Sequence, residues 1–135
     1  MAEIDVLTFE RKHVESITVT SESIKDPSKL AEFIEIKCNL ATRKSPNRPW
    51  IYLKDSATLK TVGGVRLNKN SIGTFYIDTN QGCSLNETSF GIVSKEVKNF
   101  ISNRIVVNDL QSLDRVCDLI NSLKEEGKLY TGTRN

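Results

Sequence analysis

The segment RIVVNDLQSLDRVCDLINSLKEE, residues 104–126, carries the clearest structural pattern of the chain. Its apolar residues recur at intervals of three and four, the spacing of one face of an α-helix. They are Leu110, Leu113, Val116, Cys117, Ile120 and Leu123. The pattern predicts an amphipathic helix from about Asp109 to Glu126. We expect Asn108 to cap its first turn with Gln111 as the reciprocal partner, and Gly127 to adopt the left-handed conformation after its end.

Upstream of this helix the pattern changes to that of β-strands. Residues 104–107 form a β-branched run that predicts a strand leading into the helix. Residues 50–54 alternate, with Ile51 and Leu53 expected on one face of a strand. Trp50, Tyr52 and Lys54 are then expected on the other face. Further strands are predicted at residues 4–9, 14–20, 34–40 and 74–78, whereas residues 94–102 fit a helix or a strand.

Two dipeptides add local signals. Asp26-Pro27 places a capping carboxylate before a proline, which predicts a helical turn over residues 27–33. Gly63-Gly64 predicts the tight two-residue turn of a hairpin between residues 59–62 and 65–67, because glycine readily adopts positive φ angles.

These elements together predict an α+β fold. We expect an antiparallel sheet of about five to six strands packed on the C-terminal amphipathic helix, with one or two short additional helices. A chain of 135 residues fits a single globular domain over residues 1–135, and residues 128–135 are predicted to be a flexible tail.

Composition excludes several classes of protein. No apolar run approaches the length of a membrane span, and the N-terminus lacks the pattern of a signal peptide, so we expect a cytoplasmic protein without a membrane partner. Cys38, Cys83 and Cys117 are widely spaced and form no Cys-x-x-Cys pair, and the chain has one histidine. Neither a disulfide framework nor a metal site is indicated, and no cofactor is expected.

The charges are unevenly distributed along the chain. Between Ile36 and Ile77 there are eight basic residues and one acidic residue, a local charge of +7 in a chain whose total is +2. Such a concentration of cations attracts polyanions. We expect the strand at residues 34–40 and its neighbours to direct their apolar side chains toward the helix. Lys37, Asn39 and Tyr76 should then lie on the opposite face of the sheet, together with Trp50, Tyr52 and Lys54.

A sheet face that mixes cations with aromatic rings favours single-stranded nucleic acid, because cations follow phosphates and rings stack on bases. Our main hypothesis is therefore a non-catalytic domain that binds nucleic acid through this face and an adjacent basic loop. The candidate binding residues are Lys37, Arg43, Lys44, Arg48, Trp50, Tyr52, Lys54, Lys60 and Arg66.

Two other functions remain open. The basic middle could contact an acidic protein surface, as in an inhibitor or accessory factor, because carboxylates attract lysine and arginine as phosphates do. A Glu35-x-Lys37 strand with Asp26 upstream could instead hold Mg²⁺ in a nuclease, although any amphipathic strand with alternating charges produces this pattern.

Overall fold

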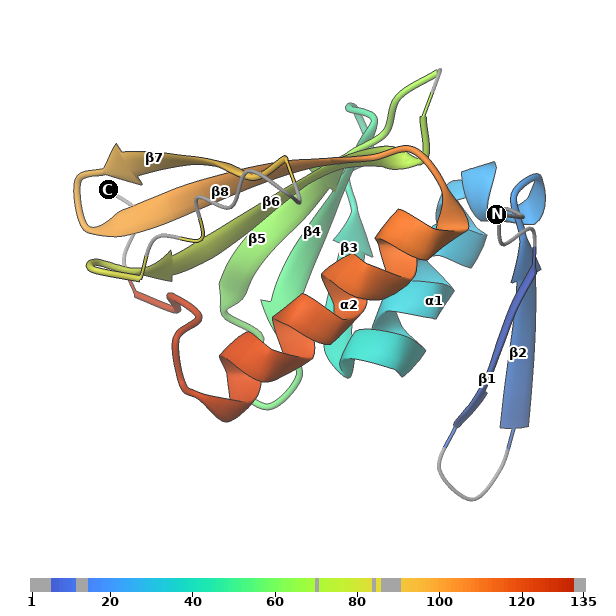
Figure 1. Cartoon of the computed structure of the whole chain (residues 1–135), viewed down its shortest axis with the longest axis horizontal. Helices are drawn as coiled ribbons and strands as arrows, with labels where there is room; N and C mark the ends of the chain where they lie inside the picture. Colours follow the sequence, from blue (N-terminus) through green and yellow to red (C-terminus); the bar gives the residue numbers. More distant parts are fainter. Residues whose placement is uncertain (1–5, 12–14, 70, 84, 86–90, 133–135) are drawn as a thin grey trace.

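The computed structural model describes residues 6–11, 15–69, 71–83, 85 and 91–132 (Figure 1). The α+β prediction is confirmed, because an antiparallel sheet is combined with a C-terminal helix and an earlier helix. In chain order the elements are β1 (Val6–Arg11), β2 (Glu15–Thr20), the 3-10 helix η1 (Ser23–Lys25), α1 (Pro27–Cys38), β3 (Leu40–Lys44), β4 (Trp50–Asp55), β5 (Thr61–Arg66), β6 (Gly73–Asn80), β7 (Val93–Val97), β8 (Phe100–Val107) and α2 (Leu110–Glu125).

The main sheet has six strands among the described residues, in the order β3-β4-β5-β6-β8-β7. Every neighbouring pair is antiparallel. Helices α1 and α2 lie side by side over one face of this sheet, and β1 and β2 form a separate hairpin next to α1 (Figure 1). The other face, turned away from the two helices, is called the open face below.

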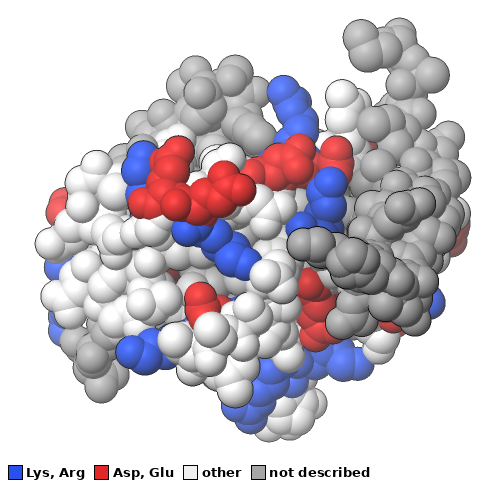
Figure 2. All heavy atoms as spheres, turned by 90° about the horizontal axis from the view of Figure 1, so that it is seen from below, with Lys and Arg blue, Asp and Glu red and all other residues white. Residues whose placement is uncertain are grey.

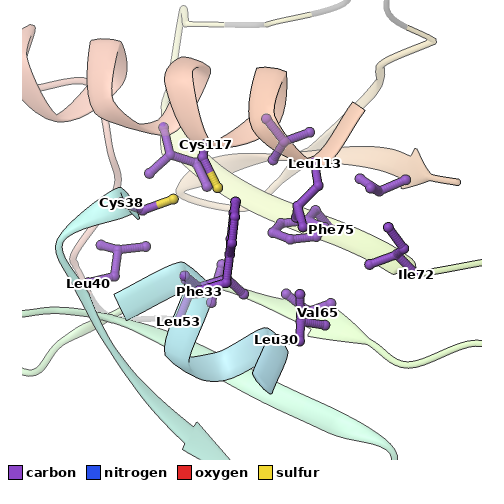
Figure 3. Close-up of a cluster of buried hydrophobic side chains, with 14 of the residues drawn as sticks. Leu30, Phe33, Cys38, Leu40, Leu53, Val65, Ile72, Phe75, Leu113 and Cys117 are labelled. Atoms are coloured by element: carbon purple, nitrogen blue, oxygen red, sulfur yellow. The ribbon is translucent and has the colours of Figure 1, made fainter. Parts of the chain in front are cut away.

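The core lies between the two helices and the sheet. Phe33 of α1, Phe75 of β6 and Leu113 and Cys117 of α2 are completely buried, and Figure 3 shows the two α2 side chains directed toward the two phenylalanines. All six apolar residues of the predicted C-terminal stripe are buried. The amphipathic helix is therefore confirmed, with its apolar face on the core.

The predicted N-terminal cap is correct for α1 and wrong for α2. Asp26 caps α1 as predicted, since its carboxylate accepts a hydrogen bond of 2.9 Å from the backbone N–H of Ser28. In α2 the cap is Asp109, which accepts from the N–H of Ser112, so the prediction of Asn108 with Gln111 is wrong by one residue. A carboxylate and an amide can both cap a helix, and sequence does not choose between adjacent candidates. Gly127 has a φ of 67°, as predicted.

The strand predicted over residues 34–40 is wrong, because α1 runs without interruption from Pro27 to Cys38. Leu30, Ile34 and Cys38 are buried at intervals of four, and Phe33 completes the helical stripe. The apparent alternation of period two arises because residues 34 and 38 belong to both patterns. The helix ends where Asn39 adopts the left-handed conformation, with a φ of 51°.

Side chains of α2 form hydrogen bonds and an ion pair with the C-terminal end of α1. The Lys124 ammonium group donates hydrogen bonds to the carbonyl oxygens of Cys38 and Asn39, at 3.0 and 2.7 Å, and thereby satisfies carbonyls that a helix end leaves without partners. Lys37 pairs with Asp114 at 3.3 Å. Burial of Lys37 opposes its charged form, but the hydrogen bond and negative charge of Asp114 outweigh this and raise the pKa of Lys37.

The Gly63-Gly64 hairpin is also wrong, because both glycines lie inside β5 and neither has a positive φ. The connection between β4 and β5 is made earlier, where the backbone N–H of Asp55 donates to the carbonyl of Lys60 at 2.8 Å. Glycine in a strand often marks a bulge or a close approach of other groups. The pairing of β4 with β5 shifts register after Leu53, which is the bulge. The backbone of β6 also lies close to Gly63, because a β-carbon there would come within 2.1 Å of the Tyr76 carbonyl oxygen.

The remaining predictions concern the C-terminal third and both ends of the chain. Residues 94–102 belong to β7, β8 and the turn between them rather than to a helix. The strands predicted at residues 4–9 and 14–20 correspond to β1 and β2, apart from residues 4, 5 and 14, which lie outside the described ranges. At the start of the predicted tail, the N–H of Tyr130 donates to the carbonyl of Asp78. Within the described residues, neither helix has the length and apolar content required to cross a membrane.

Candidate functional site

Successive side chains of β4 point alternately to the open face and to the core. Ile51 and Leu53 are 0% and 1% exposed and belong to the core under the helices, as predicted. Trp50 and Tyr52 therefore point to the open face, where both are half-buried. The pairing of β4 with β5 and of β5 with β6 brings Tyr52, Gly64 and Tyr76 into one row across the sheet.

Three aromatic rings form a cluster in the middle of the open face. The Trp50 ring lies 5.5 Å from that of Tyr76 and 6.1 Å from that of Tyr52, measured between centroids. Gly64 makes this arrangement possible, because a β-carbon at that position would come within 2.0 Å of Trp50 Cζ2. The indole thus lies directly over the strand backbone, and the glycine is required for close approach rather than for a turn.

Basic residues surround this aromatic cluster. The Arg66 guanidinium lies 5.9 Å from the centre of the Tyr76 ring, within the range of a cation–π interaction. Arg43 of β3 is directly opposite Tyr52, and Arg104 of β8 is directly opposite Tyr76. Paired residues of neighbouring strands point to the same face of a sheet, so both arginines belong to the open face. Both are exposed.

Two hollows lie next to each other on the open face, and Trp50 and Tyr52 line both of them. The outer hollow has a volume of about 410 Å³. Its described lining residues are Arg48, Pro49, Trp50, Tyr52 and Arg66. The inner hollow has a volume of about 310 Å³. Its described lining residues are Trp50, Tyr52, Thr61, Gly63, Gly64, Tyr76, Asp78, Val97, Phe100 and Ser102.

The structure places six of the nine candidate binding residues predicted from sequence on the open face. Arg48, Trp50, Tyr52 and Arg66 line the outer hollow, and Arg43 shares the open face with them. Lys54 follows Tyr52 by two residues in β4 and is paired with Thr61, which lines the inner hollow. Lys60, immediately before β5, is exposed at the end of the β4–β5 connection.

Two of the predicted residues lie on the helical side instead. Lys37 belongs to α1 and pairs with Asp114 and Asp118 of α2, at 3.3 and 3.8 Å. The Lys44 ammonium group donates a hydrogen bond of 2.9 Å to the hydroxyl of Ser28, at the start of α1. Asn39, also expected on the face of Trp50, ends α1. The expectation for Lys37 and Asn39 depends on a strand over residues 34–40, and α1 occupies this segment instead.

Sequence reasoning missed the contribution of β7 and β8 to this surface. Phe100, Ser102 and Val97 line the inner hollow, and Arg104 lies opposite Tyr76. The alternation of exposed Arg104 and Val106 with the buried Ile105 and Val107 extends through β8, and that period was the available signal. Residues 94–102 also fit a helical spacing, so the sequence alone does not decide between helix and strand for this segment.

The Glu35-x-Lys37 strand suggested for a metal-dependent nuclease does not form, because both residues belong to α1. Glu35 lies in α1, where its carboxylate accepts a hydrogen bond from the hydroxyl of Thr42, and Asp26 caps the same helix. Within the residues that the structure describes, no group of three or more His, Cys, Asp or Glu side chains is arranged to hold a metal ion.

The charge of the open face differs from that of the surface seen from below in Figure 2, where acidic and basic side chains lie next to one another. The register of the six strands assigns five basic residues to the open face: Arg43, Lys54, Arg66, Lys95 and Arg104. Of the described strand residues on this face, Asp78 is the acidic one, and it is 7% exposed. Among the described strand residues of the open face, basic side chains therefore outnumber acidic ones.

Comparison of the chain with protein-family models, with curated proteins and with solved structures gives no match.

Proposed function

We propose that the open face binds single-stranded nucleic acid. The outer hollow carries the proposal, because Arg48 and Arg66 line the same depression as Trp50 and Tyr52. Guanidinium groups pair with phosphate oxygens, and indole and phenol rings stack on bases. A phosphate therefore finds chemically suitable partners in this depression of about 410 Å³, next to aromatic rings on which a base can stack.

The distribution of charge supports the same proposal. Arg43 and Arg104 lie on the open face at either side of the row formed by Tyr52, Gly64 and Tyr76. A polyanion that runs along this row would contact a cation at each end of the aromatic centre. Contacts of this kind supply affinity and position the strand without reading its sequence.

The aromatic cluster favours a single strand over a duplex. A ring can stack only on a base whose face is accessible, and in a duplex the neighbouring bases cover these faces. Duplexes would still be attracted by the surrounding arginines. We therefore expect weaker, mainly electrostatic binding of duplex DNA or RNA and tighter binding of unpaired strands.

The fluorescence of Trp50 provides a direct test, because it is the only tryptophan of the chain. Single-stranded DNA or RNA added at low ionic strength should quench this fluorescence in a saturable manner, and Lys44→Ala should behave as wild type, since Lys44 lies on the helical side. Fluorescence anisotropy with labelled single and double strands would rank their affinities. Absence of binding by every nucleic acid at low salt would refute the proposal.

One observation favours a second candidate, a protein partner with an acidic surface. The described walls of the inner hollow are mostly aromatic or aliphatic, which suits an apolar side chain at the centre of a protein interface. Displacement of a bound protein by heparin, together with no affinity for DNA or RNA, would favour this candidate over nucleic acid.

We also infer that the protein works in a reducing compartment such as the cytoplasm. The described cysteines Cys38, Cys83 and Cys117 are all free thiols, and two of them are buried. Thiols without disulfide bonds are typical of such compartments. Measurement of the thiol content of the protein purified from its native source without reductant would test this assignment.

A further inference from the structure

The two hollows differ in charge although they share a wall. Arg48 and Arg66 line the outer hollow. Among the described residues that line the inner hollow there is no lysine or arginine, and its one Asp or Glu side chain is that of Asp78. A phosphate group is therefore stabilised in the outer hollow and finds no cation in the inner one. The inner hollow instead suits an uncharged group.

The shape and walls of the inner hollow indicate which uncharged group fits. Trp50, Tyr52 and Tyr76 supply aromatic rings, and Phe100 and Val97 supply further apolar surface. The Trp50 indole lies over Gly64, in the space that a β-carbon would need, and so forms part of the wall of the hollow. Its volume of about 310 Å³ lies at the lower limit of ordinary small-ligand pockets, which begin near ~300 Å³. Flat apolar walls in a pocket of this size match a planar heterocyclic ring.

Arg66 connects the two hollows. It lines the outer hollow, and its guanidinium lies 5.9 Å from the ring centre of Tyr76, which lines the inner hollow. A phosphate held by Arg66 would thus lie beside the rings that receive the base. The separation of charge and the position of this arginine fit the two parts of one nucleotide.

We propose that the inner hollow is a base-binding pocket, which takes one unpaired base while the adjacent phosphate is held in the outer hollow by Arg48 and Arg66. The inference rests on the proposed binding of single strands and adds a specific mode to it. The base is inserted into a pocket rather than only stacked on an exposed ring. The protein should accordingly distinguish a strand that carries bases from a phosphate backbone without them.

The test compares an oligothymidylate with an abasic strand that has the same number of phosphates. Ser102→Leu adds bulk to the inner hollow without touching the outer one, because Ser102 is half-buried and lines only the inner hollow. We expect this variant to lose affinity for the oligothymidylate by about 5- to 150-fold, the range for loss of one stacked base, and to bind the abasic strand as wild type does. Val97→Phe, in the edge strand β7, provides an independent second variant.

Arg48→Ala is the matched variant for the outer hollow. It should weaken binding of both strands by a similar factor, because both carry the same phosphates. If wild type binds both strands equally, or if Ser102→Leu and Val97→Phe fold and leave oligothymidylate affinity unchanged, the base pocket is refuted while binding of nucleic acid stands. If neither strand binds at low salt, the proposed function itself fails, and this inference fails with it.

Discussion

The indole of Trp50 lies across the backbone of Gly64, so that a β-carbon on Gly64 would come within 2.0 Å of the ring atom Cζ2 and 2.8 Å of Nε1. The Trp50 Nε1 atom is buried and has no hydrogen-bond partner among the residues that the structure describes. Trp50 also lines both hollows. The position of the Trp50 indole thus depends on having a glycine, without a β-carbon, at position 64 of the neighbouring strand β5.

Gly64→Ala should therefore reduce binding of single strands by displacing the indole. We expect the loss to approach that of Trp50→Ala, about 1 to 3 kcal/mol, because both changes remove the same stacking surface. Anisotropy titrations of the two single variants and the double variant provide the measurement. In the double variant the losses should not add, since no indole is left to displace. Full additivity would show that Gly64 acts independently of Trp50.

The salt dependence of nucleic-acid affinity should change when Arg48 or Arg66 of the outer hollow is replaced, and should not change when Lys44 on the helical side is replaced. If Arg48 and Arg66 each neutralise one phosphate, replacing either by alanine should flatten the slope of log K against log salt by about 0.7 for a single strand. Lys44→Ala should leave the slope unchanged, because Lys44 donates to Ser28 on the helical side. Equal slopes for Arg48→Ala and wild type would argue against phosphate contact in the outer hollow.

Leu113→Ala should destabilise the fold and leave the binding surface intact. Leu113 is 0% exposed between α2 and the sheet, and removal of a buried leucine side chain leaves a cavity that costs about 2 to 5 kcal/mol. Urea denaturation measures this loss. At a temperature where the variant is folded, its affinity for nucleic acid should equal that of wild type. An unchanged free energy of unfolding combined with lost binding would show that the α2 stripe is an interaction surface.

The turn after β4 should become less stable in acid. Hydrogen bonds from the backbone N–H groups of Thr58 and Ala57 hold the pKa of Asp55 below its ordinary value of 3.8. A carboxyl whose pKa is lower in the folded state stabilises the fold above the unfolded pKa, and this contribution is lost as the pH falls through the folded pKa.

Asp55→Asn is the control for this effect, because its amide oxygen can accept the same hydrogen bonds at every pH. The difference in free energy of unfolding between wild type and Asp55→Asn should be constant near neutral pH and should shrink below about pH 3.8. Urea denaturation across this range measures the difference. A difference that does not vary with pH would mean that the charge of Asp55 does not stabilise the turn.

Several parts of the fold could be predicted because they depend on near neighbours in the chain. The apolar stripe of α2, the alternation of β4 and the cap formed by Asp26 before Pro27 are all properties of segments shorter than about 20 residues. Helix and strand periodicity and capping hydrogen bonds act at this range. The same local rules indicated that Trp50 and Tyr52 would share a face opposite Ile51.

Tertiary packing decided what the local patterns left open. The sequence by itself determined the C-terminal helix, the class of fold and the basic character of the middle segment. It did not determine whether residues 34–38 continue α1, because Ile34 and Cys38 satisfy both periodicities. The structure decides for the helix, with Phe33, Ile34 and Cys38 buried on one helical stripe. Nor did it place Gly64 under Trp50 or Arg66 beside Tyr76. These relationships require the register of β4, β5 and β6, which is set by pairing between strands and by the shared core rather than by any one segment.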